Sequence, residues 1–280
     1  MIKVVAIGDV VGKVGRQSLV KALPLIRDKY QPDIIVVNGE NAAGGFGITP
    51  KILQQFLEKL EIDCVTTGNH WHDKRDIFKL LDSSERLVVP ANMFNVEKLE
   101  YGFKILQTKT GVSFAVVNIV GNAFMHTDNR NLFLCLDQIF KQIPSNVKIR
   151  IVDVHAEATS EKQGVGCYLS GTASLVFGTH SHVPTADERI LGEHTGFITD
   201  LGMTGAYDSV IGMKADAAIS RMKDGERKRF EPASKNPWVP FIIAEIDEAN
   251  GACQKIVRNR WETEELNPDR VSTYHGDQRF

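Results

Sequence analysis

The sequence predicts one α/β domain over residues 1–280, a four-layer α/β/β/α sandwich with two sheets packed together and helices outside them. Apolar strands and segments of helical periodicity alternate in the first part of the chain, which is typical of a parallel sheet covered by helices. Strands follow one another more closely in the second half. No internal repeat, low-complexity tract or linker separates the two parts, so we expect them to share one core.

The first part of the chain alternates strand and helix. Strands are expected at residues 2–8, 33–38 and 63–68, and helices at residues 15–30 and 50–61. Pro24 lies inside the first helical pattern and should bend or split that helix. Thr49 followed by Pro50 is a favourable start for the second helix, because threonine caps a helix and proline fits its first turn.

The second half is rich in strands. They are expected at residues 103–108, 111–121, 147–155, 173–180, 193–200, 239–247 and 253–262, with one helix at residues 131–143. Lys109, Thr110 and Gly111 form a turn signal between the first two of these strands, which should therefore pair as a hairpin.

Composition excludes several classes of protein. The chain is 42% hydrophobic and 24% charged, and its apolar runs fall far short of the roughly 20 residues of a membrane helix. It starts directly with a strand and not with a leader, so we expect a cytoplasmic protein. The cysteines stand singly and predict neither a disulfide framework nor a thiolate zinc site; they are Cys64, Cys135, Cys167 and Cys253.

Charge gives little indication of a nucleic-acid partner. The formal net charge of −2 creates no broad positive field. One local exception is the segment from Arg221 to Phe230, in which basic residues outnumber acidic ones. We interpret it as a solvated surface loop in preference to a patch that contacts phosphates.

Polar side chains follow five of the expected strands, where each strand ends. They are Asp9, Glu40, Asn41, Asn69, His70, His155, His180 and His182. In an open α/β sheet, ligands bind outside the carboxyl ends of the strands, so these side chains should converge there. If the chain stays extended through His180 and His182, both imidazoles point to the same side.

These residue types suit a metal centre. Carboxylate and amide oxygens together with imidazole nitrogens form a mixed set without thiolate, which favours Mn, Fe or Zn over an all-oxygen magnesium site. The donors suffice for two ions. A carboxylate such as Glu40 can bridge two metals, which at about 3.5–4 Å can clamp a phosphoryl group from both sides.

Each residue also has an interpretation without a metal. Asp9 could cap the following helix, and residues 39–45 could form a glycine-rich turn or phosphate-binding loop. Asn69 could cap a helix, and His70 could be an ordinary loop histidine. We interpret His72 as a surface or supporting side chain and not as a ligand.

The order Asp9, "GEN", "GNH", "VHAE", "GTHSH" resembles the calcineurin-like metallophosphoesterase superfamily. Two departures stand out: Val11 occupies the place of that superfamily's first histidine, and Glu40 replaces its bridging aspartate. With these departures, the motifs "NGENAAGGFGIT", "VDVHAEATSEK", "GTHSHV" and "DLGMTG" resemble the YmdB-like branch. That branch contains bacterial enzymes described as 2′,3′-cyclic-nucleotide phosphodiesterases.

The resemblance implies a site with two transition-metal ions, Fe or Mn in preference, with Zn or Mg as alternatives. One ion would be held by Asp9, Glu40, Asn41 and His182, and the other by Glu40, Asn69, His155 and His180. Glu40 would be shared, and Asn41 would replace the missing histidine. His70 matches the catalytic histidine of the superfamily, which lies beside the metals without binding them.

The function implied by the resemblance is hydrolysis of a 2′,3′-cyclic nucleotide or a short RNA end by a metal-bound hydroxide. Within the same chemistry, the alternative is a phosphomonoesterase with the same metal centre. The alternative from another class is a regulatory protein that binds RNA or a nucleotide with negligible turnover, for which the segment Arg221 to Arg229 is the one favourable feature. The sequence leaves open whether the chain forms a homo-oligomer.

Overall fold

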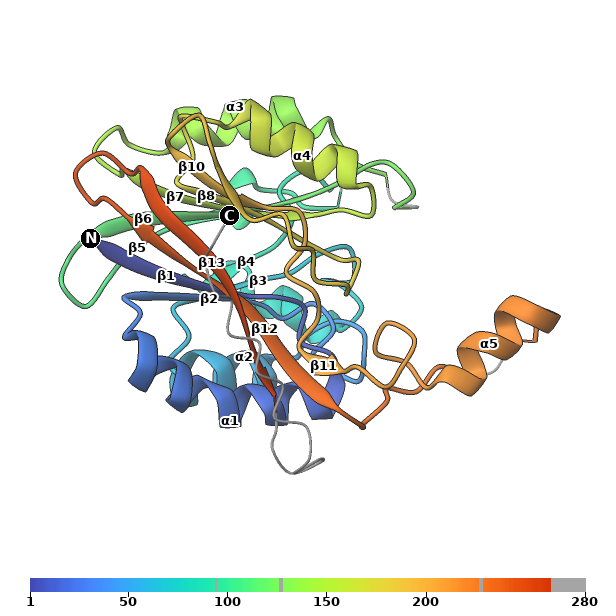
Figure 1. The fold of residues 1–280 in the computed structure, drawn as a ribbon. Helices are drawn as coiled ribbons and strands as arrows, with labels where there is room; N and C mark the ends of the chain where they lie inside the picture. The colour runs from blue at the N-terminus through green and yellow to red at the C-terminus, as the bar shows by residue number, and fades with distance from the viewer. Residues whose placement is uncertain (94, 126–127, 227–228, 263–280) are drawn as a thin grey trace.

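The computed structural model describes residues 1–93, 95–125, 128–226 and 229–262. Within these ranges the strands form two mixed sheets. Figure 1 shows the sheets face to face, with helices α1 and α2 on one outer side and α3 and α4 on the other. The chain is therefore an α/β protein, as the sequence predicts.

The first sheet is built around the expected parallel strands of the N-terminal part. Its order is β11-β12-β1-β2-β3-β4, with β13 also paired to β12. β1 to β4 are parallel, whereas β12 runs antiparallel to its neighbours β1, β11 and β13. The strands are β1 (Ile2–Ile7), β2 (Ile34–Asn38), β3 (Cys64–Thr66), β4 (Leu87–Val88), β11 (Gly205–Ala206), β12 (Pro237–Ile246) and β13 (Cys253–Glu262).

The second sheet contains the strands of the middle of the chain, in the order β5-β6-β7-β8-β10-β9. Strands β6, β7, β8 and β10 are parallel, and β5 and β9 close the two edges in antiparallel direction. The strands are β5 (Phe103–Gln107), β6 (Ser113–Val120), β7 (Ile149–His155), β8 (Leu175–Thr179), β9 (Arg189–Leu191) and β10 (Thr195–Ile198). The predicted hairpin around residues 109–111 is confirmed by the β5–β6 pair.

The helices cover the outer faces of the sheets. The α-helices are α1 (Gly12–Tyr30), α2 (Pro50–Gln54), α3 (Leu132–Gln142), α4 (Thr159–Tyr168) and α5 (Ala215–Asp224). Short turns of other helix types are η1 (Gln55–Lys59), η2 (Arg75–Leu80) and η3 (Leu99–Tyr101). None of the described helices is long and apolar enough to cross a membrane.

Three buried clusters explain this layering. The middle cluster joins side chains of both sheets, such as Val4 and Val36 of the first and Phe114 and Ile151 of the second. A second cluster packs α1 onto the first sheet, and a third packs α3 and α4 onto the second sheet. Because burial of apolar area is the main favourable term in folding, these clusters hold the sheets and helices together.

Some sequence expectations differ from the structure. Helix α1 runs through Pro24 without a split. Pro24 has no N–H to donate to the carbonyl group of Val20. Because Val20 lies on the solvent side of the helix, water can bind this carbonyl group instead. The helix expected at residues 50–61 is α-helical only to Gln54 and continues as the π-type turn η1. Thr49 caps it as expected, since its side chain accepts the N–H of Ile52 at 3.3 Å.

Candidate metal centre

The predicted site residues gather at the carboxyl ends of parallel strands from both sheets. Asp9 and Glu40 each lie two residues beyond the ends of β1 and β2, and Asn69 lies three residues beyond β3. His155 is the last residue of β7, and His180 directly follows β8. Because the two sheets pack face to face, their strand ends meet at one edge of the molecule.

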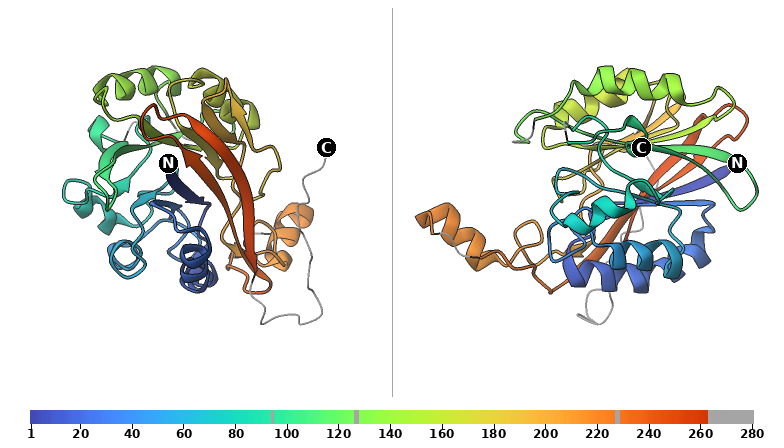
Figure 2. Two further views of the ribbon diagram at one scale, coloured as in Figure 1. Left: turned by 60° about the vertical axis from the view of Figure 1, so that its left-hand side comes forward. Right: turned by 180° about the vertical axis from the view of Figure 1, so that it is seen from behind.

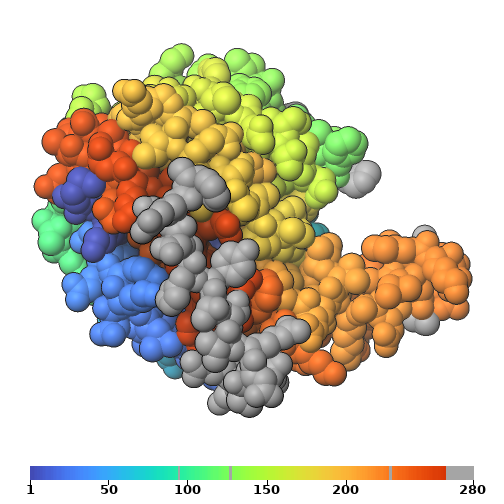
Figure 3. Space-filling view, in the orientation of Figure 1, coloured from blue at the N-terminus to red at the C-terminus, as the bar shows by residue number. Residues whose placement is uncertain are grey.

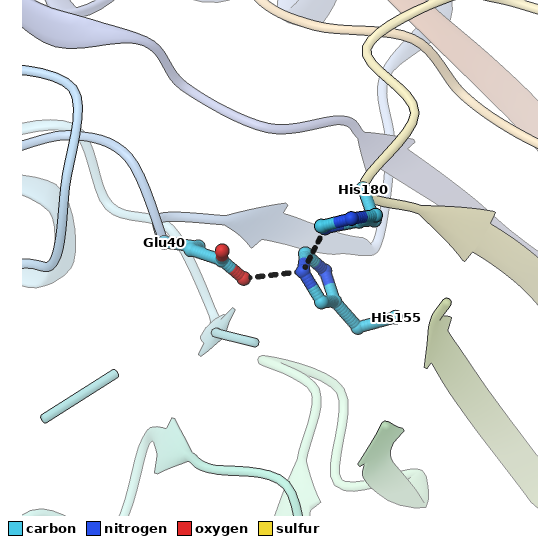
Figure 4. Close-up of side chains that lie close together, drawn as sticks. All are labelled: Glu40, His155 and His180. Atoms are coloured by element: carbon cyan, nitrogen blue, oxygen red, sulfur yellow. Dashed lines mark hydrogen bonds and ion pairs between the residues drawn. The ribbon is translucent and has the colours of Figure 1, made fainter. Parts of the chain in front are cut away.

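Glu40, His155 and His180 form a cluster that could hold a metal ion. Their ligand atoms all lie within 4.8 Å of one another, and Figure 4 shows the three side chains converging. The Nε2 atom of His155 lies 2.6 Å from Oε2 of Glu40 and 3.0 Å from Nδ1 of His180. The Oδ1 atom of Asn69 approaches the same Nε2 atom to 3.1 Å.

The hydrogen bonds around His155 assign its tautomer. Its Nδ1 atom lies 2.9 Å from the hydroxyl oxygen of Thr179, and that hydroxyl donates to Asp153 at 2.7 Å. Because the hydroxyl proton is used on Asp153, the Thr179 oxygen must accept from Nδ1–H of His155. Nε2 of His155 therefore carries a lone pair, directed at Glu40 and Asn69.

His180 is oriented in a comparable way from its other side. Its Nε2 atom lies 3.3 Å from a carboxylate oxygen of Glu157, which is an ion-pair distance, and its Nδ1 atom faces Nε2 of His155 at 3.0 Å. A histidine that binds a metal commonly donates its second N–H to a carboxylate or carbonyl, which fixes the ring. His155 is held in this way by Asp153 through Thr179, and Glu157 is the carboxylate beside the second ring nitrogen of His180.

A second cluster is formed by Asn41 and His182. Nδ1 of His182 lies 2.8 Å from the carbonyl oxygen of Ile211, so it is the protonated nitrogen, and Nε2 lies 3.0 Å from Oδ1 of Asn41. The amide of Asn41 is oriented by its Nδ2 atom, which donates to the carbonyl oxygen of Gly45 at 3.1 Å. A nitrogen lone pair and an amide oxygen therefore face each other without a hydrogen between them.

Both clusters fit a cation. At each of them, atoms that can only accept are held within about hydrogen-bond distance, and a positive charge at that point would satisfy them together. Two buried carboxylate oxygens support this interpretation, because Oδ1 of Asp9 and Oε2 of Glu40 have no hydrogen-bond partner among the described residues. The described cysteines lie outside both clusters, so the donor set is nitrogen and oxygen only.

The electrostatics agree with this interpretation. Burial, and then the nearby carboxylates of Asp200 and Glu40, raises the pKa of Asp9 well above its usual value. Burial raises the pKa of Glu40 from 4.5 to about 7. Burial also lowers the pKa of His155 well below its usual value, so the neutral imidazole, the form that binds metals, is favoured. Surplus buried acceptors without a compensating positive charge are costly.

Burial has the same effect on the other two histidines. It lowers the pKa of His180 to about 2, with a further contribution from His155. The pKa of His182 is lowered as well, mainly by burial. All three imidazoles at the strand ends are therefore neutral and available as ligands at pH 7.

His70 lies beside the first cluster without facing it as a ligand. Its backbone N–H donates to the Glu40 carboxylate, while its Nδ1 atom lies 2.9 Å from the carboxylate of Asp73. The ring packs edge-on against Phe46, with 5.1 Å between ring centroids, and the side chain is 32% exposed. One ring nitrogen of His70 is thus held by a carboxylate.

A buried ion pair supports the turn that carries His180 and His182. Nζ of Lys162 lies 2.6 Å from Oδ2 of Asp200, and both side chains are buried. The Asp200 carboxylate also accepts the backbone N–H of Ser181 at 3.2 Å and that of Gly202 at 2.7 Å. Neither partner was singled out from the sequence, although both lie in motifs of the resemblance, "VDVHAEATSEK" and "DLGMTG".

Glycine is required where β3 approaches the first cluster. A Cβ atom on Gly68 would lie 1.5 Å from Oε2 of Glu40 and 2.4 Å from Nε2 of His155. Only a residue without a side chain fits this position. The glycine of the "GNH" motif therefore allows the strand end to reach the cluster.

The expectation that the His-x-His motif is extended is wrong. The chain is not extended at the His-x-His motif, because His180 and His182 have φ values of 96° and 64°, in the left-handed region. The N–H of His180 donates to Asp9 at 3.1 Å, and this bond and the one from Ser181 to Asp200 turn the backbone. The two rings consequently reach different clusters.

The capping alternatives are also excluded. The residue that caps α1 is Val11, without a side-chain hydrogen bond, so Asp9 does not cap this helix. Asn69 directs its oxygen at His155, and the next helical turn, η2, is preceded by Lys74. His72 is half-buried, with its ring against that of Trp71 at 5.5 Å between centroids, and it belongs to neither cluster.

Several partners of these side chains could not be identified from the sequence. Asp153 carries the one available signal, because it is a carboxylate inside an apolar strand two residues before His155. Glu157 follows His155 at the same spacing, on a loop where charge alone indicates nothing. The contacts to His182 and Asn41 come from the backbone carbonyls of Ile211 and Gly45, and a backbone atom leaves no pattern in the sequence.

Comparison with known proteins identifies the family. The model of the YmdB-like protein family matches residues 5–258. The chain belongs to the YmdB-like family. It is 38% identical over 256 residues to the "2′,3′-cyclic-nucleotide 2′-phosphodiesterase" of Bacillus subtilis (strain 168), an alignment that covers 91% of this chain and 96% of the relative.

Two solved structures of similar sequence share the fold. A "hypothetical protein" from Thermus thermophilus is 34% identical with a TM-score of 0.85, over 93% of this chain and 99% of that one. A "novel phosphatase" from Mycoplasma pneumoniae is 30% identical with a TM-score of 0.86, over 93% of both chains. The similarity thus extends over nearly all of this chain and nearly all of each relative.

Proposed function

We propose that this YmdB-like protein is a dinuclear-metal phosphodiesterase that hydrolyses 2′,3′-cyclic nucleotides or related RNA-derived phosphoesters. Hydrolysis of phosphoesters follows from the family, whose named relatives are a phosphodiesterase and a phosphatase. The observation that carries the proposal is the presence of two separate groups of converging acceptor atoms, one at His155 and one at His182. The name of the Bacillus relative supports the substrate class.

The proposed allocation of ligands follows the two clusters. One ion would be held by Asp9, Glu40, Asn41 and His182, and the other by Glu40, Asn69, His155 and His180. Support comes from the contact of Asn41 with His182, from the contacts around Nε2 of His155, and from the unpartnered oxygen of Glu40, which a bridging position would satisfy. The place of Asp9 in the first set is what the resemblance implies. Fe or Mn suits such an N/O set best, with Zn or Mg as alternatives. The proposal includes a four-layer sandwich of the calcineurin-like type.

The residues around the clusters have defined roles in this proposal. When bound, two such ions activate a water molecule and withdraw negative charge from the phosphoryl oxygens. Asp153, through Thr179, holds His155 in the required tautomer, and Glu157 is the carboxylate placed to accept Nε2–H of His180 when Nδ1 binds the ion. His70 either donates a proton to the leaving alkoxide or stabilises the transition state as a cation, with Asp73 holding its Nδ1–H.

A phosphomonoesterase with the same metal centre is the alternative, which the description of the Mycoplasma structure favours. To distinguish the two functions, kcat/KM is measured with one enzyme preparation on a 2′,3′-cyclic nucleotide and on nucleoside monophosphates. We expect the cyclic substrate to be hydrolysed with the higher kcat/KM. A higher kcat/KM on the monophosphates would replace the proposed function by the alternative.

The experiment that tests metal-dependent turnover is removal and return of the metal. Chelation should abolish hydrolysis of the cyclic nucleotide, and Mn or Fe should restore it. The same samples test the regulatory alternative, because tight, strongly salt-dependent RNA binding without hydrolysis would support that function. Full activity in metal-free protein would overturn the proposal.

A further inference from the structure

The loop after β6 lies at the rim of the cluster formed by Glu40, His155 and His180. Strand β6 is parallel to β7, and its last residue, Val120, pairs with His155, so the chain leaves β6 beside this histidine. Figures 1 and 2 show the loop in green, on the same side of the molecule as the segment that carries α5. In Figure 3 the surface is indented between these two projections. A substrate bound at the cluster would therefore meet the loop.

Hydrogen bonds fix the start of this loop to the segment that follows β7. The backbone N–H of Gly121 donates to the carbonyl oxygen of His155 at 2.9 Å. The N–H groups of Asn122 and Ala123 donate to the two carboxylate oxygens of Glu161 at 2.9 and 3.2 Å. Because Glu161 lies in the first turn of α4, the loop is held by a regular element and has a set position.

Phe124 is held on both sides while its own ring lies in solvent. Its preceding neighbour, Ala123, is fixed by Glu161, and its following neighbour, Met125, is buried and accepts the N–H of Glu157 on its sulfur at 3.2 Å. The side chain of Phe124 is 78% exposed, the largest fraction among the large apolar side chains of the described residues. The loop thus presents an aromatic ring beside the cluster.

The backbone at Phe124 is also unfavourable for this residue type. Its φ of 64° lies in the left-handed region, which is rare for a bulky residue because of its Cβ atom. Glycine adopts this conformation without strain. Neither the backbone nor the exposure of the ring therefore favours phenylalanine for folding. Strained residues commonly occur where a ligand binds.

We propose that Phe124 is the base-binding residue of the active site, and that the nucleobase of the substrate stacks on its ring. This inference rests on the proposed function. In a nucleoside 2′,3′-cyclic phosphate one ribose ring separates the phosphorus atom from the base, so a phosphate bound at the cluster leaves the base at the rim. A flat aromatic ring on a fixed loop binds a planar base at little entropic cost.

The first test compares a substrate that has a base with one that lacks it. They are adenosine 2′,3′-cyclic phosphate and methyl riboside 2′,3′-cyclic phosphate. Phe124→Ala should lose about 5- to 150-fold in kcat/KM on the nucleotide, mainly through a higher KM. On the riboside it should match the wild type, with unchanged metal content.

The matched control is Tyr168→Ala, which removes a ring that is 47% exposed at the end of α4 remote from the loop. It should keep wild-type kinetics on both compounds. Because Phe124 makes little contact with the body, circular dichroism and Tm should be unchanged in Phe124→Ala.

The second test measures stacking directly, without turnover. Phe124→Trp keeps an aromatic face and should keep the kinetic preference for the nucleotide. Its indole fluorescence should be quenched to saturation by the slowly hydrolysed 2′,3′-cyclic phosphorothioate of adenosine, and not by that of methyl riboside. The wild type, with its three native tryptophans, is titrated as the blank.

Failure of this inference differs from failure of the proposed function. A wild type that hydrolyses neither cyclic compound would contradict the proposed function, while the fluorescence titration would still decide whether Phe124 binds the base. An equal loss on both compounds in Phe124→Ala, or no loss on the nucleotide, would overturn base binding by Phe124. Quenching of Phe124→Trp that is absent, or equal for the two phosphorothioates, would also overturn it.

Discussion

Glu40→Gln should stabilise the metal-free protein while weakening its binding of metal. In the folded chain, burial raises the pKa of Glu40 from 4.5 to about 7. At about 1.4 kcal/mol per pH unit, this corresponds to about 3 kcal/mol of stability lost by keeping the ionised carboxylate folded at pH 8. Glutamine carries no charge, keeps an oxygen for the N–H of His70, and can donate to the lone pair of His155.

The pH dependence has a definite sign. Between pH 4.5 and 7 the folded chain holds a proton on Glu40 that the unfolded chain has released, so stability falls as pH rises through this window. The advantage of Glu40→Gln should therefore be largest at pH 8, about 3 kcal/mol or on the order of 5 °C in Tm. It should shrink towards zero near pH 4.5.

The assay is thermal and urea unfolding of chelator-treated protein at pH 5 and pH 8, repeated with added Mn. With Mn the order should reverse, because an ion that binds only the folded state stabilises it, and both proposed ion positions use the Glu40 carboxylate. Exposed Glu58→Gln is the control and should behave as wild type. A metal-free Glu40→Gln that is no more stable than wild type at pH 8 would refute the reasoning.

Three further changes test separate parts of the molecule. His70→Ala should keep its metal content by elemental analysis and lose about 10²–10⁴ in kcat; metal loss would show that His70 is a ligand. Lys162→Met leaves the buried Asp200 carboxylate without its cation, so the free energy of unfolding measured in urea should fall by about 3–5 kcal/mol. A loss of under about 1 kcal/mol would contradict this role of the ion pair. Thr49→Ala removes the cap of α2 and should cost about 1 kcal/mol, and an unchanged Tm would mean that this cap is unimportant.

The fold class could be predicted because its signals are local. The buried strands β1 and β2 read as continuous apolar runs, and α1 keeps its periodicity through Pro24. Helix α4 was not predicted, since it contains Gly164 and Gly166 and has little amphipathic pattern. Helix α5 was not predicted, because Ala215, Ala217 and Ala218 give a weak hydrophobic signal. The segment from Arg221, which we expected to be a surface loop, begins inside this helix.

The candidate site was predictable in its residue types but not in its geometry. The side chains at strand ends could be selected because parallel strands deliver their carboxyl ends to one edge. The turn at His180 and His182 could not be predicted, because it depends on N–H bonds to the carboxylates of Asp9 and Asp200, which lie 171 and 19 residues away from their donors in the sequence. Glu157 could not be predicted as the carboxylate beside His180 either, because its place depends on how the loop after β7 packs against the end of β8.

The number of metal ions per chain tests the central claim most directly. Elemental analysis of anaerobically purified protein should give close to two transition-metal ions per wild-type chain. It should give close to one in His182→Ala, because the cluster around His155 remains intact. A wild type that holds a single ion when saturated, or a His182→Ala variant that keeps two, would contradict the assignment of a dinuclear centre.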